Sequence, residues 1–205
     1  MTRPRKKILL VGAGGTLGRA VDACLRDAGH DVLRAGRNSG EHRVDLRDDA
    51  SVRAMFDGIG TVDAVVSTAG HVHFGPLTSM DATQFDIGLQ DKLLGQVRLA
   101  LMAQHHLADG GSITLTTGIL SEEPIAQGAN AMAVNAGVEG FVRAAACELP
   151  RGLRINAVSP NVLTEAWTAY GDFFRGFEPV PAARAALAYQ RSIDGVRSGH
   201  VYKVW

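Results

Sequence analysis

The chain has 205 residues, in which 21 Lys and Arg balance 21 Asp and Glu, and 46% of the residues are hydrophobic. This length and balance predict one globular domain over residues 1–205 and give no electrostatic basis for binding nucleic acid or a membrane. Cys24 and Cys147 are predicted to be small buried side chains without a disulfide. The apolar run at 8–11 is too short for a signal peptide, so a cytoplasmic protein is expected.

Short apolar runs alternate with longer amphipathic segments along the chain. Strands are predicted at 8–11, 32–35, 42–46, 64–67, 112–116, 154–158 and 201–204. Helices are predicted at 16–28, 49–56, 82–107 and 129–148, the first ending near Gly29. This alternation predicts an α/β fold: a doubly wound parallel sheet of about seven strands with helices on both faces, which binds ligands at the carboxyl ends of its strands.

A glycine-rich turn, in the sequence KILLVGAGGTLGRAV, follows the first predicted strand and opens the first predicted helix. Gly12, Gly15 and Gly18 stand at every third position, where a tight turn needs residues that tolerate positive φ and a pyrophosphate needs backbone without a Cβ in the way. Because the start of a helix offers free N–H groups and a partial positive charge, the turn is expected to bind a dinucleotide. A plain tight turn is the alternative.

The residues after the second predicted strand indicate which dinucleotide is bound. NAD-binding chains commonly place an acidic residue about 20 residues beyond the glycine turn, where it holds the ribose hydroxyls. Here no acid occurs between Val32 and Gly40, and Arg34, Arg37 and Asn38 are present instead. A guanidinium fits a 2′-phosphate by charge and by its planar donors, so NADP(H) is favoured over NAD(H). Solvated surface arginines are the alternative.

The chain resembles the short-chain dehydrogenase/reductase family over nearly its whole length. The segments that carry the resemblance are GAGGTLG at 12–18, STAG at 67–70, GSITLTTG at 111–118, NAGVEGFVRAAACEL at 135–149 and RINAVSPNVLTE at 154–165. The resemblance implies a single Rossmann-type domain. It also implies a set of cofactor-binding residues: Gly12, Gly15, Thr16, Leu17, Gly18, Arg37, Asn38, Asp45, Leu46, Ala69, Gly70, Pro160, Val162 and Thr164.

The same resemblance implies four active-site roles, which the family gives to Asn, Ser, Tyr and Lys. The tyrosine exchanges a proton with the substrate oxygen, a nearby lysine lowers its pKa, the serine binds the same oxygen, and the asparagine holds a water that links to the lysine. The register of the matching segments places Lys92, Gly118, Ala131 and Asn135 at these positions. All four roles are therefore expected to be changed.

Other side chains are candidates for the missing groups. Lys92, with a pKa lowered by burial beside a cofactor, is a candidate acid, and Thr117 is a second candidate substitute. A snorkelling or salt-bridged surface lysine is the alternative. His71 and His73 are interpreted as loop residues, and Glu122 as a solvated carboxylate with pairing to Lys92 as the alternative. No metal site is predicted.

Five aromatic residues lie between residues 167 and 177, a segment that resembles the substrate lid of the family. They predict an apolar or aromatic small-molecule ligand, and packing of the lid or a subunit contact is the alternative. The helices at 82–107 and 129–148 resemble those that form dimers and tetramers in the family, so a homodimer or homotetramer is expected.

Two functions remain open from the sequence. The first is an NADP(H)-dependent oxidoreductase that acts on an unknown small molecule with a non-standard active site. The second is a non-catalytic NADP(H)-binding sensor or partner subunit, because the cofactor-binding residues are kept while the reactive groups are replaced.

Overall fold

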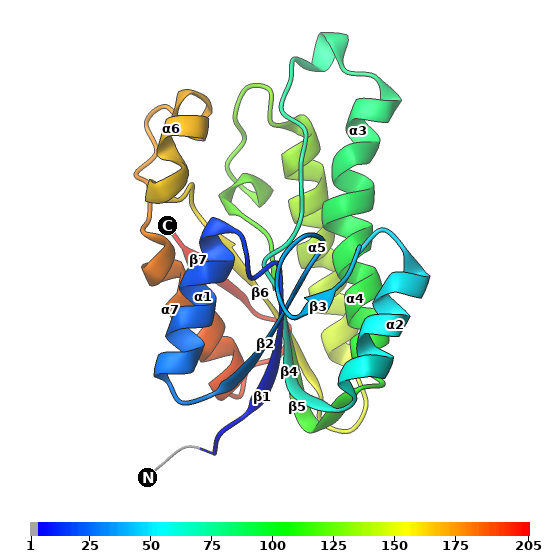
Figure 1. The fold of residues 1–205 in the computed structure, drawn as a ribbon. Helices are drawn as coiled ribbons and strands as arrows, with labels where there is room; N and C mark the ends of the chain where they lie inside the picture. Colours follow the sequence, from blue (N-terminus) through cyan, green and yellow to red (C-terminus); the bar gives the residue numbers. More distant parts are fainter. Residues whose placement is uncertain (1–3) are drawn as a thin grey trace.

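The computed structural model describes residues 4–205, which form a seven-stranded sheet with helices on both faces (Figure 1). The strands are β1 (Lys7–Val11), β2 (Asp31–Gly36), β3 (His42–Arg43), β4 (Val62–Ser67), β5 (Leu107–Thr116), β6 (Arg154–Pro160) and β7 (Val201–Val204). All neighbouring strands pair in parallel, in the order β3-β2-β1-β4-β5-β6-β7. The predicted α/β fold is confirmed.

The helices form one layer on each face of the sheet (Figure 1). Helices α1 (Thr16–Asp27) and α7 (Ala182–Asp194) cover one face, and α2 (Asp49–Ile59), α4 (Gly95–Ala103) and α5 (Ala129–Glu148) cover the other. Helix α3 (Ala82–Gly88) precedes α4, and the short helix α6 (Trp167–Tyr170) lies in the loop after β6. Among residues 4–205, no helix has the length and apolar character needed to cross a membrane.

The central strands are apolar on both faces because helices cover both of them. In β1, Ile8 and Leu10 pack toward α1 and α7, whereas Leu9 and Val11 pack toward α2, α4 and α5. All four side chains are buried, and burying such a side chain contributes roughly 1.5–3 kcal/mol. A strand buried on both faces therefore reads as an apolar run without alternation.

Several predicted element boundaries differ in the structure. The strand predicted at 42–46 is only two residues long, because the chain turns at Asp45, whose N–H donates to Ser51 Oγ. The helix predicted at 82–107 consists of α3, a π-helical segment Leu89–Leu94 and α4, and it ends at Ala103. Strand β5 begins at Leu107, before a shift in its register with β4.

Helix α7 was absent from the sequence prediction. Its buried face contains Ala185, Ala186, Tyr189 and Ile193, which is helical spacing, but alanines give a weak apolar signal. The cysteine prediction also needs correction: both thiols are free as expected, but Cys147 is exposed and Cys24 only partly buried.

Candidate functional site

Two adjoining cavities open at the carboxyl ends of the central strands and share Gly15, Thr68, Gly70 and His71. The first, here named the charged cavity, has a volume of about 420 Å³ and is also lined by Gly12, Arg37, Asn38, Ser39, Leu46, Ala69 and Asp91. The second, named the apolar cavity, has about 450 Å³ and is also lined by Thr16, Leu17, Phe74, Lys92, Thr117, Gly118, Ala131, Asn135, Pro160, Val162, Tyr170 and Phe174. The cleft lies where the strand order reverses between β1 and β4, as in other doubly wound folds.

The glycine turn after β1 is packed too closely for larger residues. Gly12 has φ +89°, and a Cβ there would lie 2.7 Å from the Ala69 main-chain nitrogen. A Cβ on Gly14 would collide with the Ser39 hydroxyl, and one on Gly18 with the Gly12 carbonyl. The glycines therefore let β1, β4 and α1 approach each other and leave bare backbone along the cleft.

Helix α1 begins at this turn with free donors. Its N-cap residue, Gly15, has no side chain to cap the helix, and its carbonyl accepts from Arg19 N at 2.9 Å. The first N–H groups of a helix have no partner within it, and the helix dipole adds a partial positive charge there. Thr16 and Leu17, in this first turn, line the apolar cavity. The turn therefore offers an anion-binding surface between the two cavities.

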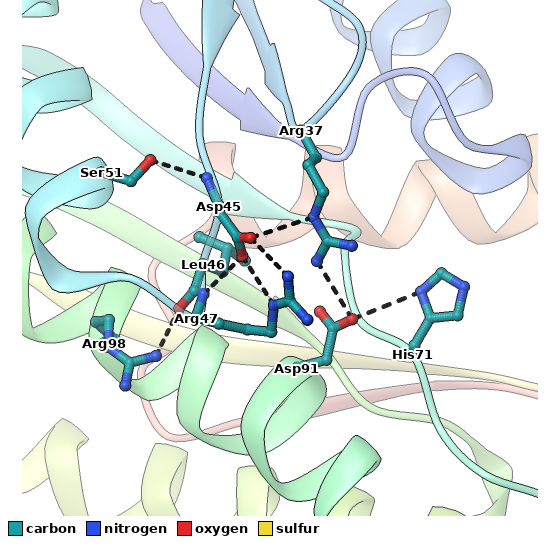
Figure 2. A network of polar contacts seen from close by, with 8 residues as sticks. All are labelled: Arg37, Asp45, Leu46, Arg47, Ser51, His71, Asp91 and Arg98. Carbon is teal, nitrogen blue, oxygen red and sulfur yellow. Dashed lines mark hydrogen bonds and ion pairs between the residues drawn. The ribbon is translucent and has the colours of Figure 1, made fainter.

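Arg37 lies at the edge of the charged cavity, between two carboxylates (Figure 2). Its Nε is 3.6 Å from Asp45 Oδ2, and its Nη2 is 3.5 Å from Asp91 Oδ2. The same Asp91 oxygen is 3.7 Å from His71 Nδ1. These contacts within residues 4–205 leave Nη1 without a recorded partner, so the guanidinium is held in place with donor capacity to spare.

Asp45 is held at the same edge by two arginines. Its carboxylate accepts from Arg47 at 2.8, 3.0 and 3.1 Å, and these hydrogen bonds, together with the charge of Arg37, hold the pKa of Asp45 well below its usual range. The next residue, Leu46, lines the charged cavity, and its carbonyl accepts from Arg98 at 2.6 Å. This strand-to-helix turn is thus fixed by contacts on both sides.

The two arginines suggested by the sequence have different surroundings. Arg34 donates to the Glu41 carboxylate at 2.8 and 3.2 Å, and it lines neither cavity. Arg37 alone of the two lines the charged cavity. This difference makes Arg34 a natural control for the role of Arg37.

Lys92 lies in the π-helical segment between α3 and α4 and lines the apolar cavity. Its ammonium donates to the Thr117 carbonyl at 3.3 Å, and burial lowers its pKa from 10.5 to about 8. Single π-helical turns inside helices are frequent at functional sites because they redirect one side chain. Near neutral pH, Lys92 is therefore close to its own pKa and can both lose and regain a proton.

Gly118, Ala131 and Asn135 line the same cavity as Lys92. Asn135 is 4% exposed, and its Oδ1 has no hydrogen-bond partner among the described residues. Its Nδ2 lies 3.4 Å from the position that a Cβ of Gly118 would take. The four positions that the family resemblance aligned are thus adjacent, with two nitrogen donors and neither a tyrosine nor a serine hydroxyl among them.

The Thr117 side chain points away from the cavity into a buried polar cluster. Its Oγ1 lies 3.0 Å from Glu139 Oε1 and 3.3 Å from the Asn135 carbonyl. Glu139 is buried and also lies 3.6 Å from Arg143 Nη1. Thr117 therefore contributes its carbonyl to the cavity, while its hydroxyl supports α5 from behind.

Aromatic residues form the outer wall of the apolar cavity. The Phe74 ring lies 5.1 Å from Phe173 and 5.8 Å from Tyr170, and Phe174 is buried. Tyr170 and Phe174 line the cavity, whereas Trp167 does not. Part of the segment predicted as an apolar lid thus faces the cavity.

Not all predicted site residues line the cleft. Gly18, Asp45 and Thr164 line neither cavity, although Gly18 and Asp45 contact residues that do. Glu122 is neither unpaired nor bound to Lys92, because it accepts from Lys203 at 2.6 Å. No group of three or more His, Cys, Asp or Glu side chains within residues 4–205 is placed to hold a metal.

Sequence reasoning did not single out Ser39, Thr68, Asp91 and Glu139. Ser39 directly follows Arg37 and Asn38, which the sequence did single out. Thr68 lies within the STAG segment, and its hydroxyl donates to the Gly12 carbonyl at 3.1 Å. Asp91 is next to Lys92 in sequence but faces the charged cavity. Only the fold brings it to Arg37, 54 positions away.

A glycine turn between β1 and α1, at the strand-order reversal of a parallel sheet, defines a Rossmann-type dinucleotide-binding fold. A family model described as enoyl-(acyl carrier protein) reductase matches residues 19–198. The chain belongs to the short-chain dehydrogenase/reductase family of oxidoreductases.

Relatives are found among both sequences and structures. An uncharacterized oxidoreductase of Mycobacterium tuberculosis is 29% identical over 189 residues, which cover 80% of this chain and 70% of the relative. The crystal structure of lin1944 from Listeria innocua is 47% identical with a TM-score of 0.95, over 97% of this chain and 99% of that one. A small-chain dehydrogenase crystallised in complex with NADPH is 28% identical with a TM-score of 0.88, over 98% and 97%.

Proposed function

We propose that the protein is an NADP(H)-dependent oxidoreductase that acts on a small organic molecule. The observation that carries the proposal is the continuous cleft, which has a paired arginine at one end, a glycine turn in the middle and an ionisable lysine in an apolar cavity at the other end. The NADPH complex of a structural relative supports the choice of cofactor.

The residues of the cleft fit a dinucleotide with a 2′-phosphate. Gly12, Gly14 and Gly15 leave bare backbone along the charged cavity, and the start of α1 would hold the pyrophosphate. Arg37 would hold the 2′-phosphate with its remaining donors, because Asp45 and Asp91 fix the other edge of the guanidinium. When bound, the nicotinamide supplies or accepts a hydride.

Lys92 is the residue proposed to exchange a proton with the substrate. Burial lowers the pKa of Lys92 to about 8. Position 131, where the family pattern has a proton-donating tyrosine, is an alanine. A general acid or base works best when its pKa is near the working pH. The aromatic wall would exclude water from this site.

The test of the cofactor assignment compares two arginines. NADPH and NADH are titrated into the wild type, Arg37→Ala and Arg34→Ala, following nicotinamide fluorescence. Arg37→Ala is expected to weaken NADPH binding roughly 10- to 100-fold while leaving NADH binding almost unchanged. Arg34→Ala removes the same charge outside the cleft, so it should bind both nucleotides like the wild type. Equal binding of NADPH by all three proteins would refute the assignment.

A second function is favoured by the residues at 118 and 131. Gly118 and Ala131 line the cavity without any group able to donate a proton, which suits a protein that binds NADP(H) without turnover, as a sensor or partner subunit. NADPH consumption with a panel of carbonyl compounds separates the two functions. Turnover that is lost in Lys92→Met supports the oxidoreductase, and tight NADPH binding with no turnover supports the sensor.

Self-association stays a prediction. The outer surface of α4 exposes Leu101, and Leu94 is exposed just before this helix. We propose that this surface contributes to a contact between copies of the chain, as the family resemblance predicts. Sedimentation analysis of the wild type and Leu101→Glu tests this directly, since a charge at a buried contact opposes association.

A further inference from the structure

The positive charge of Lys92 is not balanced by the protein. Among residues 4–205, no carboxylate makes an ion pair with its ammonium, and the recorded partner is the Thr117 carbonyl at 3.3 Å. The lining of the apolar cavity includes no aspartate or glutamate. Asp91, the next residue in sequence, lines the charged cavity and pairs with Arg37. A charged group in such a cavity is stabilised most by an anionic partner.

Lys92 and Asn135 both keep unused hydrogen-bonding capacity toward the apolar cavity. An ammonium has three N–H donors, and the Thr117 carbonyl accepts one of them, which leaves two for a ligand. Asn135 is only 4% exposed, yet its side-chain oxygen has no hydrogen-bond partner among residues 4–205. Its Nδ2 lies 3.4 Å from the position that a Cβ of Gly118 would take. The side-chain oxygen can only accept, so it is available to a ligand group that donates a hydrogen bond.

We propose that the apolar cavity takes an organic acid whose carboxylate is adjacent to the reacting carbonyl, as in a 2-oxo acid with an apolar or aromatic tail. Lys92 binds one carboxylate oxygen and the neighbouring carbonyl oxygen with its two remaining donors. This assignment rests on the proposed oxidoreductase function and names its substrate class.

The rest of the cavity accounts for the tail of this acid. Phe74, Tyr170 and Phe174 form a wall of rings, and Ala131, which stands where the family pattern has a tyrosine, packs in the same apolar cluster as Phe74 and Phe174. The volume of about 450 Å³ has to hold the nicotinamide as well as the acid, so it suits a small organic acid. The polar end of the ligand therefore lies at Lys92 and its apolar end under the aromatic wall.

The proposed reaction balances with NADPH as the reductant. A nicotinamide bound in the cleft would supply the hydride to carbon C2 of the 2-oxo acid, the C=O π electrons would move to the oxygen, and Lys92 would give that oxygen a proton. The products are a 2-hydroxy acid and NADP⁺, and neutral Lys92 regains its proton from solvent. The carboxylate is unchanged, and it stabilises the charged lysine before the transfer.

Three related compounds separate the parts of the assignment. Phenylpyruvate has the carboxylate and the ketone, phenylacetone has the ketone alone, and 3-phenylpropanoate has the carboxylate alone. Each is titrated by calorimetry into the full-length protein, with and without saturating NADP⁺. The two carboxylates are expected to bind at least about ten-fold more tightly than phenylacetone.

Two lysine variants test where the carboxylate binds. Lys92→Met is expected to weaken 3-phenylpropanoate binding about 30-fold or more, because it removes a desolvated charge partner. Lys7→Met is the matched control: the Lys7 ammonium also donates to a main-chain carbonyl, that of Ile59 at 2.9 Å, but at the opposite end of β1. It should bind the acid like the wild type. Circular dichroism confirms that both variants are folded.

The outcomes distinguish the substrate class from the function. Equal affinity of Lys92→Met and wild type for 3-phenylpropanoate, or equal affinity of phenylacetone and phenylpyruvate, overturns the substrate class. Loss of NADPH binding in Lys92→Met overturns it too, because the partner of the lysine is then a cofactor phosphate. If the wild type binds the acids through Lys92 but binds no nicotinamide nucleotide, the proposed function fails while the acid site stands.

Discussion

The two cavities of the cleft differ in whether the positively charged side chain that lines them is paired with a carboxylate. In the charged cavity, Arg37 has carboxylate partners on two sides, and Arg47 pairs with one of the same carboxylates (Figure 2). In the apolar cavity, Lys92 has a main-chain oxygen as its recorded partner. Paired charges are oriented before a ligand arrives, whereas an unpaired buried charge gains its partner from the ligand. The first arrangement suits the positioning of a cofactor, and the second suits selection of a substrate by charge.

The largest effect is expected at the turn that joins the cavities. Gly12→Ala places a Cβ 2.7 Å from the Ala69 nitrogen at φ +89°, so it combines steric collision with a strained backbone. We expect it to lower the free energy of unfolding by about 3 kcal/mol or more and to abolish nucleotide binding. Urea denaturation and NADPH titration measure the two effects.

Gly29→Ala is the control for that variant. Gly29 has nearly the same torsion, φ +86°, but a Cβ there has open space around it. Backbone strain alone should cost it about 1 kcal/mol with NADPH binding unchanged. Similar losses for both glycines would show that close packing of the turn is unimportant.

The support behind the apolar cavity is expected to have the next largest effect. Thr117→Val removes the hydroxyl that lies 3.0 Å from Glu139 and leaves that buried carboxylate with one hydrogen-bond donor fewer. The free energy of unfolding should fall by about 1–3 kcal/mol. Thr117→Ser keeps the hydroxyl and should recover most of this loss, and a loss as large in the serine variant would contradict the role assigned to the hydrogen bond.

The unpaired lysine should give the two cavities different pH behaviour. Burial lowers the pKa of Lys92 from 10.5 to about 8, so the unfolded chain binds more protons than the folded one between these values. The stability of the wild type should therefore rise relative to Lys92→Met as pH increases from about 8 to 10.5. The change should be on the order of 1 kcal/mol, because the Lys92 side chain is half-buried and solvent screens part of its charge. Parallel stability curves for the two proteins would show that the ammonium is already solvated.

The smallest effect is expected in the charged cavity. Arg47→Ala removes a partner of Asp45 at a solvent-exposed surface, so the free energy of unfolding should fall only slightly. Because the pKa of Asp45 is held low in the folded state, this contribution is present above the ordinary carboxylate pKa and is lost as pH falls. Denaturation at several pH values checks both size and sign, and a loss that grows in acid would contradict the pairing.

Local patterns predicted the elements that carry strong signals. The glycine turn with its flanking strand and helix, and the central strands β1, β4 and β6, appear where periodicity and turn residues place them. The prediction missed the alanine-rich α7 and the first five residues of β5, a segment that includes Gly110 and Gly111. These elements are stabilised by contacts with distant segments, which no local window contains.

The candidate site divides in the same way. The sequence singled out Gly12, Arg37 and Lys92, because residue type and spacing are local properties. Both Arg34 and Arg37 have the residue type for a 2′-phosphate, and the family resemblance selects Arg37. The structure adds that Glu41 pairs with Arg34 and that Asp91 pairs with Arg37.

By itself, the sequence determined the fold class, the glycine turn and the residue types at positions 92, 118, 131 and 135, because each depends on short-range patterns in the chain. Only the tertiary structure decided that Asp91 faces one cavity while Lys92 faces the other, although the two residues are adjacent. A helix directs consecutive side chains about 100° apart, so what surrounds each of them depends on which strands and loops the fold packs against that helix. The sequence shows that Lys92 carries a positive charge. Only the structure shows that this charge has no carboxylate partner among residues 4–205.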